Sequence, residues 1–140
     1  MKVVVDTNVF IGACFGQGAC RAVIAACLEE RLLPLMGVAL FAEYEDVLGR
    51  TELFARSRLN AAERAELLDI FLATCCWTRI YYGWRPNLRD EGDNHLVELA
   101  VAGGAEYIVT RNLRDVASME LLFPGLKAVF PETLCKEMKL

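Results

Sequence analysis

Short strand-like runs alternate with helix-like segments along the chain, and this alternation limits the possible folds more than any other feature. The β-branched run at 3–5 opens the series. The further expected strands cover 32–36, 76–82, 107–110 and 126–130. Apolar residues at helical spacing or helix-start signals mark helices at 19–30, 38–48, 60–72, 94–102 and from 131 onward. The glycines at 12, 16 and 18 predict a turn after the first strand, and a short turn or helix is expected at 112–117. Such alternation predicts βαβ units and a parallel sheet covered on both faces. We therefore expect an α/β fold, a three-layer α/β/α sandwich with a central, mostly parallel sheet of about five strands.

The length and the apolar content are consistent with that fold. A chain of 140 residues fits one domain, expected to span 1–140. Its hydrophobic share of 55% favours a sheet buried on both faces. No segment approaches 18 consecutive apolar residues, and Asp6 interrupts the N-terminal apolar run too early for a signal peptide. We expect a cytoplasmic protein that does not insert into a membrane.

The cysteines and the net charge exclude some classes of site. No C-x-x-C pair occurs and the chain has one histidine, so a structural zinc site is not expected. Cys20 and Cys27 lie on the apolar stripe of an expected helix, which favours reduced, mostly buried thiols. A net charge of −4 gives no sign of a nucleic-acid partner. If nucleic acid is the substrate, local basic residues or metal ions must supply the positive charge.

Polar residues gather where the expected strands end. Asp6–Asn8 follows the first strand, Thr110–Asn112 follows the fourth, and Asp90–Asp93 leads into a helix. Glu43 lies on the helix after the second strand. In open α/β sheets, ligands bind beyond the carboxyl ends of the strands. These groups are therefore expected at one edge of the sheet.

Clustered acids at such an edge favour a divalent cation. Two carboxylates about 5 Å apart repel by roughly 3 kcal/mol at an effective dielectric of 20. Hard cations such as Mg²⁺ and Mn²⁺ prefer oxygen ligands, and they can activate water and neutralise a phosphodiester. Each acid also has a plain structural interpretation: Asp6 and Asp93 as helix caps, and Glu43 as a solvated helix residue. Residue by residue, both interpretations remain open.

The order of the motifs resembles a known family. The matching segments are 3–10, 43–48, 89–94, 96–100, 104–112 and 115–116. Together they resemble a PIN domain, of the kind found in the VapC-like toxins of toxin–antitoxin systems. The resemblance implies an Mg²⁺- or Mn²⁺-dependent endoribonuclease, a hydrolase of RNA phosphodiester bonds. It also implies a homodimer or higher homo-oligomer and a cognate antitoxin protein that silences the enzyme.

The resemblance assigns roles to individual residues. The catalytic and metal-binding acids would be Asp6, Glu43 and Asp93. Orienting or outer residues would be Thr7, Asn8, Asp90 and Thr110. Many PIN domains carry a fourth acid after the fourth strand, where this chain has Asn112. Asn112 or Asp115 is thus a further candidate ligand, and a second metal position is in doubt.

The basic residues and the histidine indicate a function less specifically than the acids do. Arg111 and Arg114 flank the expected crevice and are candidate contacts for substrate phosphates, although solvated arginines would look the same in sequence. His95 is expected to be a lone surface histidine. No histidine is therefore expected to serve as a general base at the site.

Other functions are less consistent with the pattern. A haloacid-dehalogenase-like phosphatase needs a second Asp two residues after the first, where this chain has Asn8. A receiver domain needs an acidic pair after the first strand, which is not evident. The main alternative is a PIN-fold binding module with weakened catalysis, acting through protein or RNA contacts, and Asn112 is its support. Metal binding that depends on Asp6 would distinguish an active site from an inactive one.

Overall fold

A five-stranded, all-parallel sheet forms the centre of the molecule. The computed structural model describes residues 1–80, 94–113 and 123–140. The strands are β1 (Lys2–Val5), β2 (Leu33–Met36), β3 (Cys76–Trp77), β4 (Tyr107–Val109) and β5 (Lys127–Val129), arranged in the order β3-β2-β1-β4-β5. The expected α/β class and five-stranded parallel sheet are therefore confirmed.

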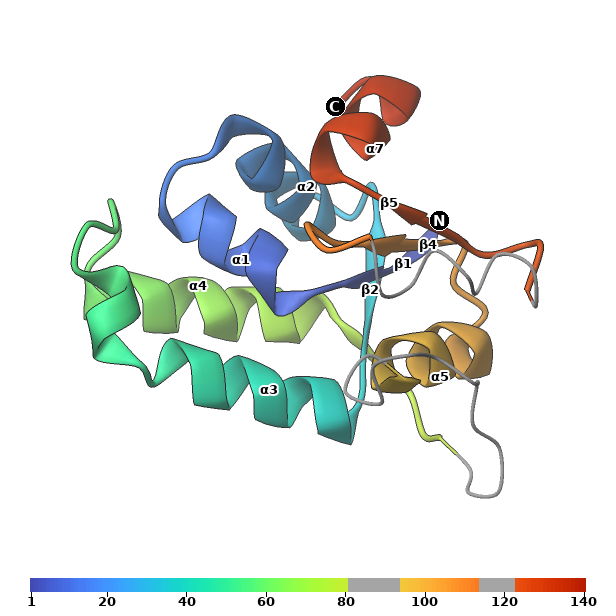
Figure 1. Cartoon of the computed structure of the whole chain (residues 1–140), viewed down its shortest axis with the longest axis horizontal. Coiled ribbons are helices and arrows are strands. Elements are labelled where there is room, and N and C mark those ends of the chain that lie inside the picture. Colours follow the sequence, from blue (N-terminus) through green and yellow to red (C-terminus); the bar gives the residue numbers. More distant parts are fainter. Residues whose placement is uncertain (81–93, 114–122) are drawn as a thin grey trace.

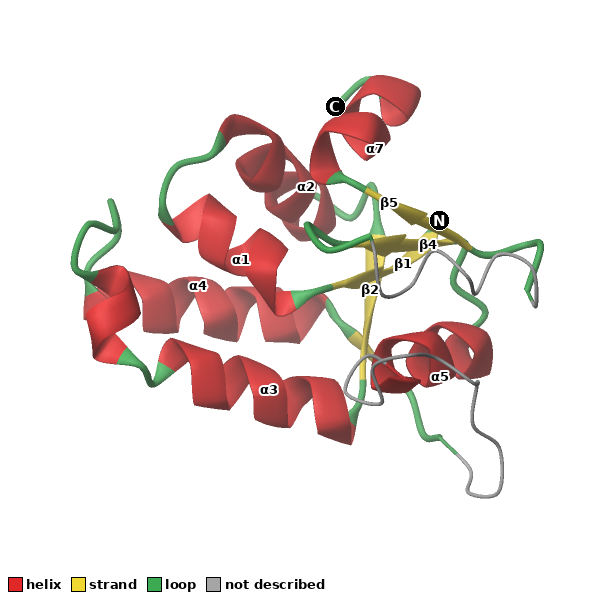
Figure 2. Cartoon of the chain, in the orientation of Figure 1, coloured by secondary structure: helices red, strands yellow, loops and turns green. Residues whose placement is uncertain are grey.

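Helices cover both faces of the sheet (Figure 1). They are α1 (Thr7–Cys14), α2 (Gly18–Leu28), α3 (Val38–Leu48), α4 (Ala61–Thr74), α5 (Asn94–Gly103) and α7 (Pro131–Met138), with a short 3₁₀ helix, η1, at Thr51–Phe54. Helix α5 packs against β1, β2 and β4, while α2 packs against α1, α4 and α7 on the other side. Figure 2 shows the same layers by secondary structure, with the strands between the helices. The helices shield the strands from water on both faces, which explains their continuous apolar runs.

The core follows directly from the sequence pattern. Val3, Val4 and Val5 are almost completely buried, as a central parallel strand requires. Helix α4 begins at the predicted capping box, in which the side chains of Asn60 and Glu63 each accept a hydrogen bond from the other residue's backbone N–H. The six cysteines are free thiols, as expected.

The segment after β1 corrects one prediction. The glycines at 12, 16 and 18 indicated a turn, but residues 7–14 form helix α1. Val9, Phe10, Ala13 and Cys14 are buried on this helix, at the spacing of a helical face. A Cβ on Gly12 would lie 2.6 Å from Cys20 Sγ, so this glycine allows α1 and α2 to approach closely.

The third strand is shorter than the predicted 76–82. It covers Cys76–Trp77 and pairs with β2, at the edge of the sheet that the described residues form. Residues 81 and 82, together with most of the predicted turn or helix at 112–117, lie outside the described residues. In the described part of the chain, no single helix has the length and apolar composition to cross a membrane. Helices α1 and α2 pass such a test only as a pair bent by 107°.

The strand order places a switch point between β1 and β4. Successive strands after β1 extend to one side of it, and β4 and β5 lie on the other. Ligand sites of open α/β sheets form beyond the carboxyl ends of the strands at such a point. Asp6 and Thr110 follow the two strands that flank it.

Candidate active site

Asp6 and Thr110 lie side by side because β1 and β4 are in parallel register. Val5 is paired with Val109, so the next residue of each strand extends past the same edge of the sheet. The Asp6 backbone N–H donates to the carbonyl of Val109 at 3.0 Å, which continues the ladder by one step. Two residues far apart in the chain are thereby held as neighbours by backbone geometry.

The Asp6 carboxylate is buried and accepts hydrogen bonds on both oxygens. Oδ1 accepts from the Thr7 backbone N–H at 2.8 Å, and Oδ2 accepts from the Thr110 hydroxyl at 2.8 Å. The first bond makes Asp6 the N-cap of α1, so the capping role and the site role coexist. Burial raises the pKa of Asp6, the Thr110 hydrogen bond partly offsets this, and the Glu43 charge raises the pKa further. Binding a cation would relieve this cost of a buried charge.

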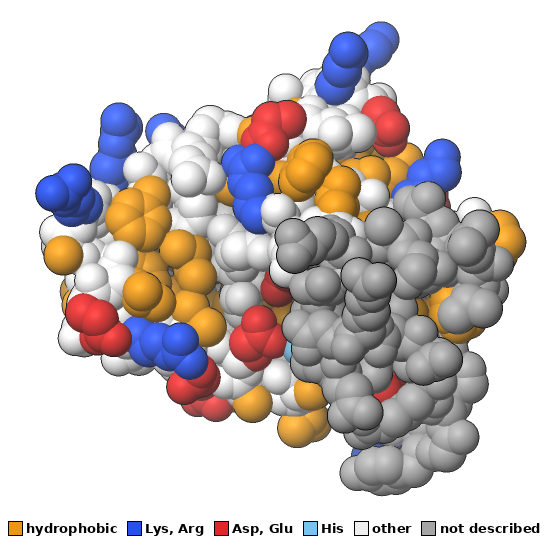
Figure 3. Space-filling view, viewed as in Figure 1, with side chains coloured by type: hydrophobic (Ala, Val, Ile, Leu, Met, Phe, Trp, Pro, Cys, Tyr) orange, Lys and Arg blue, Asp and Glu red, His pale blue; other side chains and the backbone are white. Residues whose placement is uncertain are grey.

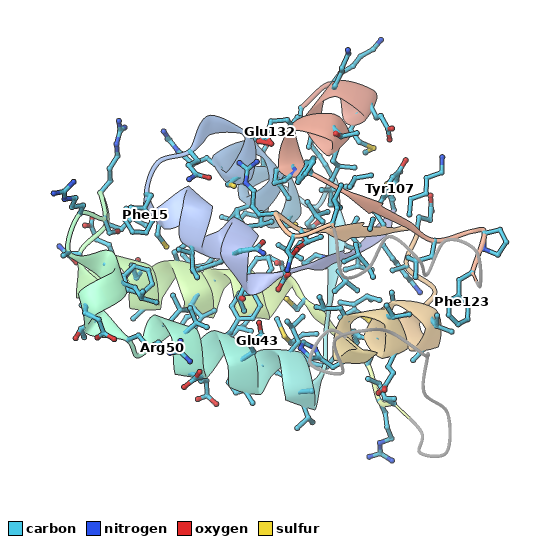
Figure 4. All side chains as sticks on the ribbon, in the orientation of Figure 1. Phe15, Glu43, Arg50, Tyr107, Phe123 and Glu132 are labelled. Atoms are coloured by element: carbon cyan, nitrogen blue, oxygen red, sulfur yellow. The ribbon has the colours of Figure 1, made fainter. Side chains whose placement is uncertain are left out.

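Glu43 faces the same point from helix α3 (Figure 4). Its neighbour Tyr44 is completely buried and donates a 2.8 Å hydrogen bond to the Val5 carbonyl, which fixes α3 against the end of β1. Glu43 Oε1 accepts from the Thr7 hydroxyl at 3.0 Å. The same hydroxyl lies 3.5 Å from Asp6 Oδ1, so Thr7 connects the two carboxylates.

Asn8 ties the ends of β1 and β4 together. Its Nδ2 lies 3.3 Å from both Asp6 Oδ2 and Thr110 Oγ1, and its Oδ1 accepts from the Arg111 backbone N–H at 3.0 Å. Thr110 Oγ1 also accepts from the Asn112 backbone N–H at 3.0 Å. Thr7, Asn8 and Thr110 thus all contact Asp6, and their role as orienting residues stays a prediction.

His95 is not the lone surface histidine that the sequence suggested. Its Nε2 lies 2.7 Å from Glu43 Oε2, and its side chain is only 18% exposed. The hydrogen bond from His95 is the main cause that lowers the pKa of Glu43. Local sequence patterns do not indicate this contact, because 52 residues separate the partners. The position of the histidine two residues after Asp93 was the one available signal.

Arg111 is directed toward the neighbouring helices. Its guanidinium forms an ion pair with Glu132 on α7 and lies 3.2 Å from Gln17 Oε1. It also contacts Cys20 Sγ at 3.3 Å. A phosphate contact by Arg111 would therefore compete with Glu132 for the same guanidinium.

The predicted site residues Asp90, Asp93, Arg114 and Asp115 lie outside the described residues. Within the described ranges, no three His, Cys, Asp or Glu side chains are grouped so that they would hold a metal ion. The described donors are nevertheless of the right kind for Mg²⁺ or Mn²⁺, because Asp6 and Glu43 present carboxylate oxygens joined by a hydroxyl. Asp6 and Glu43 therefore fit two ligands of such an ion.

A separate pocket lies away from these acids. It has a volume of about 340 Å³ and is lined mostly by apolar residues of α1, α2, α4 and the loop before α4, together with Arg21 and Arg58. On the face shown in Figure 3, hydrophobic side chains gather on the side of Phe15, which is labelled in Figure 4. Neither Asp6 nor Glu43 lines this pocket, so its chemistry is distinct from that of the acidic site.

Comparison with known proteins identifies the family of the chain. The family model described as "PIN domain" matches residues 2–114. The chain belongs to the PIN domain family. The match includes β1, Asp6, Glu43 and Thr110, the elements that build the acidic site. It also includes Asp90, Asp93 and Arg114, its last residue, and ends before Asp115.

A solved structure shows the same fold. The crystal structure of VapBC2 from Rickettsia felis, bound to a DNA fragment from their promoter, matches with a TM-score of 0.56. The alignment covers 93% of the present chain and 98% of that chain, at 15% sequence identity. No curated protein matches the chain in sequence. The structural likeness therefore supports the architecture, and the family match supports the class of protein.

Proposed function

We propose that this PIN domain is a metal-dependent endoribonuclease that hydrolyses RNA phosphodiester bonds. The observation that carries the proposal is the pairing of a buried Asp6 carboxylate with Glu43 at the switch point of a PIN-family sheet. Holding two carboxylates together in a partly buried place costs free energy unless a cation compensates. Such a cost is typical of a binding site and is not needed for capping a helix.

The chain's own residues would hold and orient the ion. Asp6 and Glu43 would be ligands, with Asp93 as the third acid that the family resemblance supplies. Thr110 and the Thr7 backbone N–H each occupy one lone pair of Asp6, which leaves other lone pairs for a ligand bond. Bound Mg²⁺ or Mn²⁺ would supply Lewis acidity toward the phosphodiester and neutralise its developing charge. The prior ordering of the acids by hydrogen bonds reduces the reorganisation needed when substrate binds.

The proposal extends to biological role and partners. The VapBC2 structure has this fold and is described as bound to DNA from "their promoter", which supports a protein partner for the present chain by analogy of fold. We propose that the chain is the toxin of a toxin–antitoxin pair, cytoplasmic, and a homodimer or higher homo-oligomer. Induction in a bacterial host should stop growth, and co-expression of a small adjacent reading frame should restore it. Growth arrest by the Asp6→Asn variant as well would contradict a nuclease toxin.

Cleavage of single-stranded RNA tests the enzymatic proposal directly. Purified protein is incubated with a labelled RNA of mixed sequence in Mg²⁺ or Mn²⁺, with and without EDTA. Asp6→Asn keeps the size of the side chain and removes its charge. Asp69→Asn, at an exposed position on α4, is the matched control. We expect cutting by wild type and Asp69→Asn, and none by Asp6→Asn or in EDTA.

The same assay can reject the proposal. Equal cutting by Asp6→Asn would show a contaminating nuclease. Absence of cutting by wild-type protein free of any co-purified partner would favour a binding module that has lost catalysis, to which Asn112 points.

A further inference from the structure

His95 and Glu43 form a contact between helices α5 and α3, which are far apart in the sequence. His95 lies in the first turn of α5, and its Nε2 is 2.7 Å from Oε2 of Glu43 on α3. Because an ionised carboxylate can only accept hydrogen bonds, the ring donates its Nε2–H to Glu43. Helix α5 packs against β1, β2 and β4, so His95 is presented by an element that is anchored to the sheet.

The pair differs from an incidental surface contact. The His95 side chain is 18% exposed and Glu43 is 37% exposed. The ion pair of Arg50 with Asp46, on the same helix α3, has exposed fractions of 53% and 64%. Pairs as exposed as the latter contribute little to stability and fix no geometry. The smaller exposure of His95 limits the positions that its ring can occupy.

Glu43 is held at both of its oxygens. Thr7 donates to Oε1 at 3.0 Å, and His95 donates to Oε2 at 2.7 Å. A glutamate has three rotatable side-chain bonds, so one hydrogen bond leaves the carboxylate free to pivot, whereas two from opposite elements fix its plane. Each oxygen keeps a lone pair that can bind a cation. His95 therefore does not compete with the site but determines how Glu43 faces it.

We propose that His95 is a positioning residue, which orients the Glu43 carboxylate for binding of the divalent cation. This inference rests on the proposed nuclease function and adds a residue that the acidic pattern alone does not contain. Outer hydrogen-bond partners of metal ligands typically contribute 10- to 100-fold to metal affinity or activity. The effect should therefore appear in metal affinity itself, before any RNA is added.

Two amide substitutions at His95 distinguish the position of the hydrogen-bond donor from the type of donor group. The amide nitrogen of Gln extends to about the place of histidine Nε2, whereas that of Asn reaches only to the place of Nδ1. His95→Gln thus preserves the donor to Glu43, and His95→Asn removes it while keeping the same functional group. His95→Ala removes the side chain altogether. Glu45→Gln, at an exposed position two residues from Glu43 on α3, is the control.

The first readout is Mn²⁺ affinity of the full chain, measured by electron paramagnetic resonance of free Mn²⁺. We expect affinity to fall 10- to 100-fold in His95→Ala and His95→Asn. His95→Gln should remain within a few-fold of wild type, and Glu45→Gln should match it. Because Gln and Asn also differ in size, a residue with only a packing role would show its loss in thermal stability as well as in Mn²⁺ affinity, whereas a positioning residue should lose Mn²⁺ affinity at nearly unchanged stability. Far-ultraviolet circular dichroism and thermal unfolding check that each variant is folded.

The second readout is RNA cleavage as a function of Mn²⁺ concentration. Saturating Mn²⁺ should restore most of the kcat of His95→Asn, because the variant binds the ion weakly but retains the acids. Wild-type affinity for Mn²⁺ in folded His95→Ala, or equal affinities of the Gln and Asn variants, would overturn the inference while leaving the nuclease proposal intact. If Asp6→Asn binds Mn²⁺ as tightly as wild type, both the role of His95 and the nuclease proposal are overturned.

Discussion

The Thr110 hydroxyl donates a 2.8 Å hydrogen bond to Oδ2 of Asp6, joining residues 104 positions apart in the chain. The same Thr110 oxygen accepts from the Asn112 backbone N–H and lies within reach of Asn8 Nδ2, so its hydrogen-bonding capacity is filled. A hydroxyl with its lone pairs occupied in this way has one direction left for its proton, toward the acid. Thr110 therefore acts as a fixed donor to Asp6.

Replacing Thr110 with valine tests this donor. Valine keeps the shape of the buried side chain but leaves Asp6 Oδ2 without its shortest partner. We expect the free energy of unfolding in urea to fall by about 2 kcal/mol, because hydrogen bonds to charged groups contribute roughly 1.5–3 kcal/mol. Mn²⁺ affinity should fall about tenfold. Thr110→Ser keeps the hydroxyl, and loss of Mn²⁺ affinity in both variants would show that the methyl group matters instead.

The pKa of Asp6 predicts how stability depends on pH in metal-free protein. Burial raises the pKa of Asp6 in the folded state, so folding favours the protonated acid. The contribution of Asp6 to stability is then fully present below the unfolded pKa and is lost as pH rises through the folded pKa. Asp6→Asn removes this penalty and should be more stable than wild type at pH 7, with the difference shrinking as pH falls toward 4.

Metal removal provides the control for that experiment. Both proteins are unfolded by urea across the pH range in EDTA, and the series is repeated in Mn²⁺. Mn²⁺ should stabilise wild type at pH 7 by about 2.7 kcal/mol at a concentration 100-fold above its Kd, and Asp6→Asn by much less. A stability difference that does not change with pH would contradict the raised pKa as its cause.

Tyr44 should contribute to the site through the backbone. Its hydroxyl is completely buried and donates to the Val5 carbonyl, directly before Asp6. Tyr44→Phe leaves that carbonyl without this partner, and we expect the free energy of unfolding to fall by about 1–2 kcal/mol. Tyr107→Phe is the matched control, because the Tyr107 hydroxyl bonds Glu137 at an exposed position and its loss should cost below about 0.5 kcal/mol. Equal losses in the two variants would contradict this difference in burial.

Local sequence patterns predicted the sheet and the placement of its polar ends. Val3–Val5 indicated a buried parallel strand, and parallel strands align their carboxyl ends, so Asp6 and Thr110 could be expected at one edge. The helix after β1 was missed because Gly12 suggested a turn. Its actual role is to let α1 approach Cys20, a tertiary contact that no local propensity reports.

The features that the sequence did not predict are contacts between elements far apart in the chain. His95 on α5 contacts Glu43 on α3, and Arg111, two residues after β4, contacts Glu132 on α7. Each depends on helix orientation and side-chain rotamer, which periodicity does not determine. The sequence therefore predicts which acids could form the site, but it does not predict the contacts that His95 makes with Glu43 and Arg111 makes with Glu132.

Two glycines of the same segment should respond differently to alanine. A Cβ at Gly12 would lie 2.6 Å from Cys20 Sγ and 2.7 Å from Gln17 Oε1, whereas a Cβ at Gly18 would meet nothing within 4 Å. We expect Gly12→Ala to lower the free energy of unfolding by about 1–3 kcal/mol, as overpacking does. Gly18→Ala should be neutral or stabilising by about 0.4–1 kcal/mol. Urea unfolding measures both, and a neutral Gly12→Ala would show that the Cys20 and Gln17 side chains move aside easily.

The ion pair with Glu132 occupies the Arg111 guanidinium, so an RNA phosphate would have to compete with Glu132 for it. Glu132→Gln weakens that pair and should leave Arg111 available to RNA. In an Asp6→Asn background that does not cut, fluorescence anisotropy should show RNA bound a few-fold more tightly, with the slope of log K against log salt steeper by about 0.7, as one added phosphate contact requires. Glu137→Gln, on the same helix, removes an equal charge without touching Arg111 and should leave the slope unchanged. If both variants change RNA binding alike, the effect is one of net charge, and Arg111 is a structural link between β4 and α7 only.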